Sequence, residues 1–351
     1  MNTATSARPV ALWLFAVAAL IFAMVTVGGI TRLTRSGLSI VEWNPVMGAI
    51  PPLTEQQWQG EFEKYQQSPE YRQVNAGMSL DEFKRIYYVE WTHRLLGRLI
   101  GVVFFLPLVY FAVRARIPRR VTPKLIAIFL LGGLQGGLGW FMVKSGLVDV
   151  PRVSPYRLTA HLGLAVAIYG LTLWLALELF TPRNTIGNAP TRLRRLGWVV
   201  TALVFLMILA GGFVAGTHAG YAFNTFPLMN GRLFPEGMFA LDPWWINFFE
   251  NLSTVQFDHR VLAYVLVLAV LFYWSVALRA DIPPAVRRAL HLLLLAVLVQ
   301  ASLGIATLLW VVPITLATLH QAGALLVFSL AVHINHALGR RTDREQNPDA
   351  G

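Results

Sequence analysis

Residues 90–113, EWTHRLLGRLIGVVFFLPLVYFAV, join a charged cluster to a long apolar run. Glu90, His93 and Arg94 stand at its start, and the run that follows has about the length that crosses the hydrocarbon core of a bilayer. Charged groups near hydrocarbon are costly, so an ionisable residue there is a candidate functional group. The stretch therefore predicts a membrane helix with a site at its mouth.

The whole chain has the composition of an integral membrane protein. Of its 351 residues, 56% are hydrophobic and 13% are charged, whereas a soluble domain carries roughly 25% charged residues. The net charge is +11, but the basic residues lie between apolar runs, which argues against nucleic acid and for membrane lipid as the partner. The chain has no cysteine, which excludes disulfides, thiolate-bound metals and thiol catalysis.

The sequence predicts an all-α integral membrane protein with eight transmembrane helices. A helix needs about 20 mainly apolar residues to span the bilayer. Gly28 and Gly29 continue the first apolar run past the length of a signal peptide, so we interpret it as a retained span. The eight runs are 10–31, 92–113, 124–143, 157–180, 196–216, 259–278, 287–310 and 313–336.

Basic residues gather on one side of the predicted membrane. Because the number of spans is even, both termini lie on the same side of the membrane. The loops after spans two, four and six lie on that side as well. Short loops rich in Lys and Arg stay in the cytoplasm, so we predict cytoplasmic termini, with segments 32–91 and 217–258 outside. The basic residues of that side are Arg8, Arg114, Arg116, Arg119, Arg120, Lys124, Arg183, Arg192, Arg194, Arg195, Arg279, Arg287, Arg288, Arg340, Arg341 and Arg344.

The outer segment 32–91 has the pattern of two short helices. Thr54 with Gln57, and Ser79 with Glu82, have the spacing of capping boxes. After both caps, aromatic residues recur at helical spacing. They are Trp58, Phe62, Tyr65, Phe83 and Tyr87. Two interpretations stay open: helices that lie on the membrane surface, or a lid over a site.

The two halves resemble each other, which predicts two pseudo-symmetric four-helix bundles. Each half has an even number of spans, so both enter from the same side and form a parallel repeat. The predicted units are 1–180 and 181–351. The offset between matching motifs shrinks along the chain, as loop deletions would require. The motifs are GGITRLTRSG (28–37) with GGFVAGTHAG (211–220), EWTHR (90–94) with QFDHR (256–260), QGGLG (135–139) with QASLG (300–304), and AHLGLAVAIYG (160–170) with LHQAGALLVFS (319–329).

The repeat sorts the eight histidines. His93 pairs with His259, His161 pairs with His320, and all four fall in the outer half of the predicted membrane. Each half thus offers two imidazoles on alternate helices, as a six-coordinate haem iron needs, because the porphyrin supplies four nitrogens. Zinc is disfavoured because no further ligand accompanies a pair. The remaining histidines are placed outside the site; they are His218, His291, His333 and His336.

Three features near these histidines have two interpretations each. Arg94 and Arg260 directly follow a histidine and suit either haem propionates or anchoring at the membrane surface. His291 is a packing residue or part of a proton relay. The glycines of the third span let that helix approach either another helix or a porphyrin face. They are Gly132, Gly133, Gly136, Gly137 and Gly139.

An asymmetry between the halves indicates chemistry. Glu90 lies one turn before His93 on the same helix face, whereas its counterpart Gln256 cannot ionise. Asp258 is out of phase with that face. A carboxylate one turn from a haem ligand can exchange a proton with a substrate or stabilise positive charge on it, so Glu90 is the predicted catalytic residue. The alternative is a glutamate that interacts with the dipole at a helix start.

Four motifs carry a family resemblance: EWTHRLLGR (90–98), SGLSIVEWNPVMGAIPP (36–52), AFNTFPLMNG (222–231) and TLHQAGA (318–324). On these motifs the chain resembles haem A synthases, and the resemblance covers nearly its whole length. It fits the form of these enzymes that lacks a cysteine pair in the outer loop. His218 departs from this resemblance, because no functional histidine is expected at that position.

The resemblance implies an enzyme of the bacterial inner membrane that oxidises the C8 methyl group of haem O to the formyl group of haem A, for terminal oxidase assembly. It implies that His93, His161 and Glu90 hold the haem under conversion, while His259 and His320 bind a haem b that passes electrons on. Haem O and a haem O synthase are the expected partners. The electron acceptor, with quinone as a candidate, and assembly into a homo-oligomer stay open.

Two other functions compete with this one. A membrane b-type cytochrome that carries electrons from quinol would place haem ligands at inner and outer levels of the bilayer, whereas the four candidate ligands share one level. A transporter built from parallel repeats would have broken helices and polar residues near the midplane, which these spans largely lack.

Overall fold

The computed structural model describes residues 3–44, 47–181 and 189–339. Its regular structure is helical, and within these ranges eight helices are long and apolar enough to cross a membrane. They are α1 (Thr3–Leu33), α4 (Leu80–Val113), α5 (Thr122–Lys144), α6 (Pro155–Phe180), α7 (Thr191–Thr217), α9 (Leu252–Leu278), α10 (Pro284–Leu309) and α11 (Ile314–Leu338). Each matches one predicted span, so the all-α membrane fold is confirmed.

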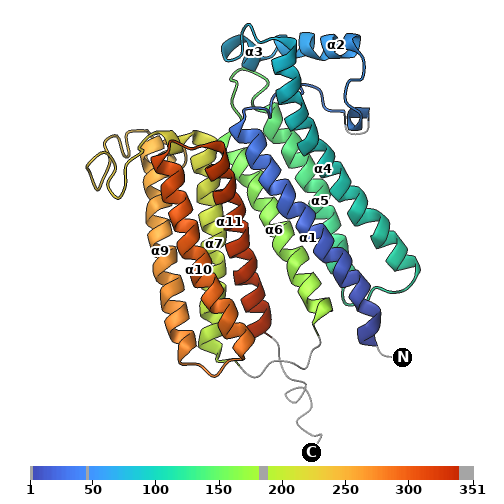
Figure 1. The fold of residues 1–351 in the computed structure, drawn as a ribbon, viewed down its shortest axis with the longest axis vertical. Coiled ribbons are helices and arrows are strands. Elements are labelled where there is room, and N and C mark those ends of the chain that lie inside the picture. Colours follow the sequence, from blue (N-terminus) through green and yellow to red (C-terminus); the bar gives the residue numbers. More distant parts are fainter. Residues whose placement is uncertain (1–2, 45–46, 182–188, 340–351) are drawn as a thin grey trace, which may run out of the picture.

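The eight long helices form two neighbouring groups. Figure 1 shows α1, α4, α5 and α6 on one side and α7, α9, α10 and α11 on the other. The groups meet where α6 contacts α7 and α11, and where α1 contacts α11. The packing of α6 on α7 is as extensive as the packing within each group. The division into two pseudo-symmetric units after residue 180 therefore stays a prediction.

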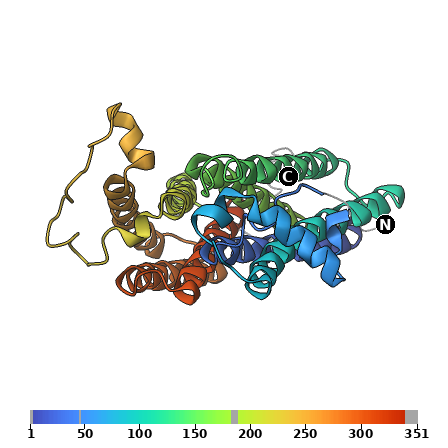
Figure 2. The ribbon, with the colours of Figure 1, turned by 90° about the horizontal axis from the view of Figure 1, so that it is seen from above.

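The shorter helices lie in the two segments predicted to face outward. They are η1 (Met47–Ala49), α2 (Glu55–Gln66), α3 (Pro69–Gln73), η2 (Ala219–Tyr221), η3 (Trp244–Ile246) and α8 (Asn247–Glu250). Figure 1 shows α2 and α3 at the end of the bundle opposite to the start of α1. Figure 2 shows the segment between η2 and α8 looping out to one side of the helices. Both segments thus lie at one end of the bundle.

Both predicted capping boxes are present, but the second one begins a membrane helix. The hydroxyl groups of Thr54 and Ser79 each accept a hydrogen bond at 3.3 Å, from the backbone N–H of Gln57 and of Glu82. Ser79 caps α4, which continues without a break through the membrane span. The second short helix of the sequence prediction is therefore the outer part of α4. Glu90 lies well inside this helix, so its interpretation as a helix-start residue is wrong.

The aromatic residues of α2 and of the outer part of α4 pack against each other. The rings of Trp58 and Tyr87 lie 5.0 Å apart edge to face, and those of Tyr65 and Phe83 lie 5.1 Å apart and stacked. These side chains form a small buried cluster. The apolar face of α2 is therefore covered by protein, which contradicts a helix that lies on the membrane with this face in lipid.

Candidate functional site

A cavity of about 1240 Å³ is lined by residues of all eight membrane helices. It brings together side chains that lie far apart in the sequence, from both halves of the chain. Every site residue predicted from the sequence lines it: Glu90, His93, Arg94, His161, His259, Arg260 and His320.

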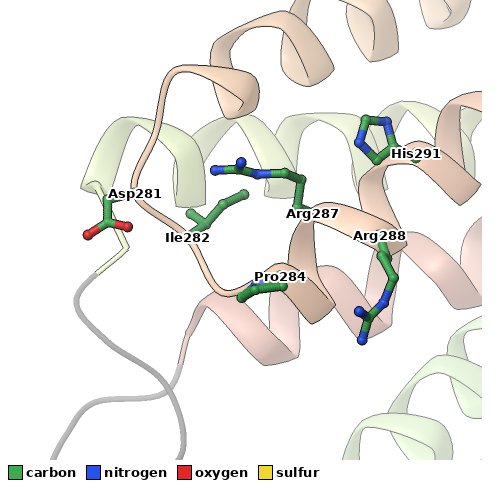
Figure 3. A pocket seen from close by; sticks show the side chains of 6 residues that line it. All are labelled: Asp281, Ile282, Pro284, Arg287, Arg288 and His291. Atoms are coloured by element: carbon green, nitrogen blue, oxygen red, sulfur yellow. The ribbon is translucent and has the colours of Figure 1, made fainter.

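A separate pocket of about 420 Å³ lies at the turn between α9 and α10 (Figure 3). It is lined by Asp281, Ile282, Pro284, Arg287, Arg288 and His291. The Nδ1 atom of His291 accepts a hydrogen bond of 2.9 Å from Trp274 Nε1. This pocket adjoins the start of α10, whereas the residues of α10 that line the large cavity begin at Val297. His291 therefore lies outside the site, as predicted.

Each of the first two histidines lies against a glycine of a neighbouring helix. A Cβ atom placed on Gly28 of α1 would lie 3.1 Å from Nε2 of His93 on α4. A Cβ atom on Gly139 of α5 would lie 2.9 Å from Cε1 of His161 on α6. Both distances are shorter than ordinary contacts of a Cβ atom, so glycine supplies the room that the imidazole rings occupy.

The second half repeats this arrangement with the matching residues. A Cβ atom on Gly211 of α7 would lie 3.4 Å from Cε1 of His259 on α9. A Cβ atom on Gly304 of α10 would lie 2.8 Å from Cε1 of His320 on α11. Gly28 and Gly211, like Gly139 and Gly304, occupy equivalent positions of the sequence repeat. Both halves therefore build two histidine pockets from the same helix pairs.

A glutamine contacts the second histidine of each pair. Gln135 Nε2 donates to the backbone carbonyl of His161 at 3.0 Å, and Gln300 Nε2 donates to that of His320 at 2.7 Å. Gln300 Nε2 also lies 3.0 Å from the Nδ1 atom of His320. The Nδ1 atoms of His161 and His259 are buried without a hydrogen-bond partner. Because buried polar atoms are normally paired, these two nitrogens are exceptions among the described side chains.

The members of each histidine pair are close enough to interact electrostatically, His93 with His161 and His259 with His320. In the part of the chain that the structure describes, no three His, Cys, Asp or Glu side chains come together as a metal site. A metal ion held by either pair would need further ligands from outside these side chains. The glycine-lined pockets around the imidazoles fit axial ligation of haem iron.

Glu90 is fixed by four hydrogen bonds. Its Oε1 atom accepts from Nε and Nη2 of Arg94 at 3.0 and 2.7 Å, and its Oε2 atom accepts from Ser39 Oγ and the Ile40 N–H, both at 2.8 Å. Arg94 also donates to the carbonyls of Ile40 and Glu42 at 2.8 and 3.0 Å. The Glu90–Arg94 pair thus clamps the segment after α1 to α4.

Gln256 and Arg260 form the corresponding clamp in the second half. Gln256 Nε2 donates to the carbonyls of Ala219 and Phe223 at 2.9 and 3.2 Å. Arg260 donates to the carbonyls of Phe223 and Thr225 at 3.0 and 2.9 Å, and to Gln256 Oε1 at 3.3 Å. Phe223 and Thr225 are the repeat equivalents of Ile40 and Glu42. The geometry of the clamp is therefore conserved between the halves, while its charge is not.

The two arginines are occupied within these clamps. Their guanidinium groups bind backbone carbonyls of the outer segments, although Arg94 and Arg260 both line the cavity. Neither contact distinguishes an anchor at the membrane surface from a partner of haem propionates. Both roles stay predictions.

The glycines of α5 do not serve helix packing. A Cβ atom on Gly132, Gly133, Gly136 or Gly137 would meet nothing within 4 Å. Close packing against another helix is therefore the wrong interpretation for these four positions. Gly132, Gly133 and Gly136 line the cavity, so a flat ligand against this face stays the predicted role.

His218 lies closer to the site than the sequence indicates. It lines the cavity just after α7, in a left-handed conformation with φ of 64°. Burial, together with the positive charges of Arg32, Arg152 and Arg35, lowers its pKa to about 4. One sequence signal bears on this placement: the repeat aligns His218 with Arg35. In the structure Arg35 also lines the cavity, and it has a φ of 52°.

The other two histidines lie outside the cavity. His333 is exposed on α11, and the ring of His336 lies edge-on against Trp174 at 5.1 Å. Neither lines the cavity. Their place outside the site stays a prediction, with which this position is consistent.

A second carboxyl group in the cavity was missed by sequence reasoning. Glu70 on α3 is only 4% exposed and lines the cavity. Burial and the charge of Glu90 raise its pKa to about 7. The Ser68–Pro69 start of α3 is a helix signal, but a helix of five residues shows no periodicity that would place Glu70 in a site.

Comparisons with known proteins agree with these features. Residues 11–332 match the family model COX15-CtaA, described as cytochrome oxidase assembly protein. The chain is 55% identical to a haem A synthase of Nitrosospira multiformis, over 95% of this chain and 94% of that protein. It is 55% identical to one of Nitrosomonas eutropha, over 93% and 92%, and 52% identical to one of Parvibaculum lavamentivorans, over 97% of both.

Proposed function

Because the chain belongs to the family of cytochrome oxidase assembly proteins and to its haem A synthases, we propose that it oxidises the C8 methyl group of haem O to the formyl group of haem A. It is a multi-pass membrane enzyme, an oxidoreductase of haem A biosynthesis for cytochrome oxidase. The methyl group as the reacting site, the division of labour between the halves and the residues that carry it are our proposal.

We assign the substrate to the first half of the cavity. His93 and His161 would hold the iron of haem O, and the open glycine face of α5 would lie along the porphyrin. The observation that carries this assignment is the charge difference between two otherwise equivalent clamps. Only the clamp next to His93 contains a carboxylate, and a carboxylate held in place can stabilise charge that develops on a substrate.

The contacts of Glu90 indicate what its carboxylate does. All four of its lone-pair positions already accept hydrogen bonds, so it cannot take a proton without breaking one of them. A carboxylate held in place can instead stabilise positive charge that develops at the methyl carbon. We therefore favour charge stabilisation over proton transfer as the role of Glu90.

The second half would hold haem b between His259 and His320. When bound, this haem supplies one-electron transfer through its iron. Gly211 and Gly304 leave room for the two imidazoles, and the hydrogen bonds from Gln300 orient His320. Gln256 gives this clamp no carboxylate, which is consistent with a site that carries electrons and performs no bond-making step.

We further propose that the protein lies in the bacterial inner membrane with both termini in the cytoplasm. The loops at the end of the bundle opposite to α2 and α3 carry the basic residues, which favours this orientation. Substrate haem would then be converted near the periplasmic surface. Reporter fusions that place the turn between α4 and α5 in the periplasm would contradict it.

A quinol-linked b-type cytochrome is not favoured, because the four histidines line one cavity. The test of the proposed function is extraction and identification of haems from cells with and without the gene. Cells that lack it should accumulate haem O and contain no haem A, and the gene in trans should restore haem A. Unchanged haem A in the deletion strain would refute the proposal.

A further inference from the structure

The cavity contains a carboxyl group that the proposed chemistry has not used. Glu70 points into the cavity from the outer segment, and its side chain is nearly inaccessible to solvent. A buried carboxyl group costs stability unless it is neutral or well paired. In the part of the chain that the structure describes, Glu70 forms no ion pair, and the hydrogen bond of its carboxyl group comes from Tyr65.

The hydrogen bonds of Glu70 connect it toward the outer surface. Its Oε2 atom accepts from the hydroxyl of Tyr65 on α2 at 3.3 Å, and that hydroxyl accepts from Asn75 Nδ2 at 2.7 Å. Tyr65 is fully buried in the aromatic cluster of the outer segment, whereas Asn75 lies just after α3. A chain of hydrogen-bonding groups thus leads from the cavity into the outer segment.

The charges around Glu70 are balanced between two sides. Arg35, from the segment after α1, favours the carboxylate, while Glu90, from α4, disfavours it. Tyr65 donates to it from α2, and burial disfavours its charged form most strongly. The resulting pKa of about 7 leaves both protonation states accessible near neutral pH.

The two carboxyl groups of the cavity therefore differ in what they can do. Glu90 has its four acceptor positions filled, whereas Glu70 accepts one long hydrogen bond and can gain or lose a proton without breaking a clamp. Among the described residues of the second half, no carboxyl group lines the cavity. Its outer segment carries Glu236, Asp242, Glu250 and Asp258, of which only Asp258 is partly buried.

We propose that Glu70 is the proton-exchange residue of the cavity, which takes up protons released from the substrate, with the Tyr65 hydroxyl as its hydrogen-bond partner on the side of the outer segment. This inference rests on the proposed function. Oxidation of the alcohol stage to the aldehyde, R–CH₂OH → R–CHO + 2 H⁺ + 2 e⁻, sends its electrons to an acceptor of the haem or quinone class. A carboxylate holds one proton at a time, so Glu70 accepts the two protons in succession and releases the first to water before it takes the second.

The experiment compares Glu70→Gln with Glu63→Gln, which removes an exposed carboxylate from α2, and with Glu70→Asp, which keeps the titrating group. Haem A formation by Glu70→Gln should fall about 10²-fold, and its rate should no longer rise with pH through about 7. Glu70→Asp should restore part of the rate, and Glu63→Gln should match the wild type. The absorption spectrum of haem b, as a measure of folding, should be unchanged in all three.

A readout without turnover separates this inference from the proposed function. Infrared spectra of the purified protein should contain the C=O band of a protonated carboxyl group that titrates near neutral pH. The band should vanish in Glu70→Gln and persist in Glu63→Gln. Absence of the titrating band, or wild-type rate and pH profile in Glu70→Gln, would overturn the role of Glu70. If the wild type itself makes no haem A from haem O, the proposed function fails instead.

Discussion

The Glu90–Arg94 clamp of the first half and the Gln256–Arg260 clamp of the second half hold equivalent backbone carbonyls with equivalent side chains. They differ in one atom type, an oxygen in Glu90 where Gln256 has an amide nitrogen. That change reverses the direction of hydrogen bonding, because Glu90 accepts from Ser39 and Ile40 while Gln256 donates to Ala219 and Phe223. A neutral residue therefore suffices to build the clamp of the second half, whereas Glu90 adds a carboxylate that forms an ion pair with Arg94.

The outer segments differ more than the membrane helices do. Both halves keep a glycine against each histidine and a left-handed residue after the first helix, Arg35 in one and His218 in the other. Only the first half adds α2 and α3, which bring Glu70 to the cavity. The two halves thus share the arrangement of histidine and glycine, and the outer segment makes the first half different.

The strongest test of the comparison removes a histidine from each half. His259→Ala or His320→Ala should abolish low-spin haem b, because a bis-histidine site loses an axial ligand. His93→Ala should leave that haem in place and stop haem A formation, since it belongs to the other site. Absorption and electron paramagnetic resonance spectra of purified variants measure the outcome.

The matched control for these variants is His333→Ala, because His333 is exposed on α11 and does not line the cavity. Its spectrum should equal that of the wild type. Loss of haem b from His333→Ala as complete as from His320→Ala would disprove the ligand assignment.

The charge of the clamp is tested by exchanging its residues. Glu90→Gln keeps the size of the side chain but exchanges one carboxylate oxygen, which accepts from Ser39 or Arg94, for an amide nitrogen, so the haem b spectrum is recorded as the measure of folding and should be unchanged. Haem A formation should fall by about 10²–10⁴-fold if the carboxylate acts only in the transition state. Haem analysis of cells should then find haem O or its alcohol in place of haem A.

The reverse exchange, Gln256→Glu, should confer no activity on the second half. A single carboxylate does not supply the substrate pocket of the first half or the carboxyl group of Glu70. For the forward exchange, near-normal haem A production by Glu90→Gln would show that Glu90 has only a structural role in the clamp.

A smaller effect is expected from the glycines that face the histidines. Gly304→Ala would place a Cβ atom 2.8 Å from His320, so the imidazole must shift, whereas Gly211→Ala would meet His259 at an ordinary 3.4 Å. Haem b affinity should fall about 10-fold in Gly304→Ala and little in Gly211→Ala. Gly137→Ala, which meets nothing within 4 Å, is the control. Equal affinities in titrations of all three with haem would show that these glycines do not shape the pocket.

A pH-dependent effect concerns the stability of the outer segment. The pKa of Glu70 is about 7 in the fold and 4.5 in its absence, so the folded state binds more protons between these values. This contribution is fully present below about pH 4.5 and is lost as the pH rises through about 7. Its size is on the order of 3 kcal/mol at most.

Glu70→Gln should remove this pH dependence, whereas Glu63→Gln should retain it. Thermal unfolding of the purified protein at several pH values, followed by tryptophan fluorescence, measures it. A wild-type protein whose outer segment gains stability between about pH 5 and about pH 8 would contradict the sign of the effect.

Much of the fold and half of the site could be predicted from the sequence. The eight spans follow from the length of apolar runs, which is a property of each run alone. The repeat selected His93, His161, His259 and His320 among eight histidines, and all four line one cavity. Capping boxes at Thr54 and Ser79 are likewise local, because their partners lie three residues away.

Only the tertiary structure decided how the charged groups are used. Ser39 and Ile40, which donate hydrogen bonds to Glu90, lie about 50 residues away from it in the chain. No periodicity or spacing in the sequence encodes such a contact. The burial of Glu70 depends in the same way on the packing of α2 and α3 over the cavity, and the proximity of Arg32 to His218 depends on contact between the two halves. A membrane span is determined by the number of apolar residues in one continuous run of the chain. The protonation and the hydrogen bonds of a buried group are determined instead by the segments that fold around it.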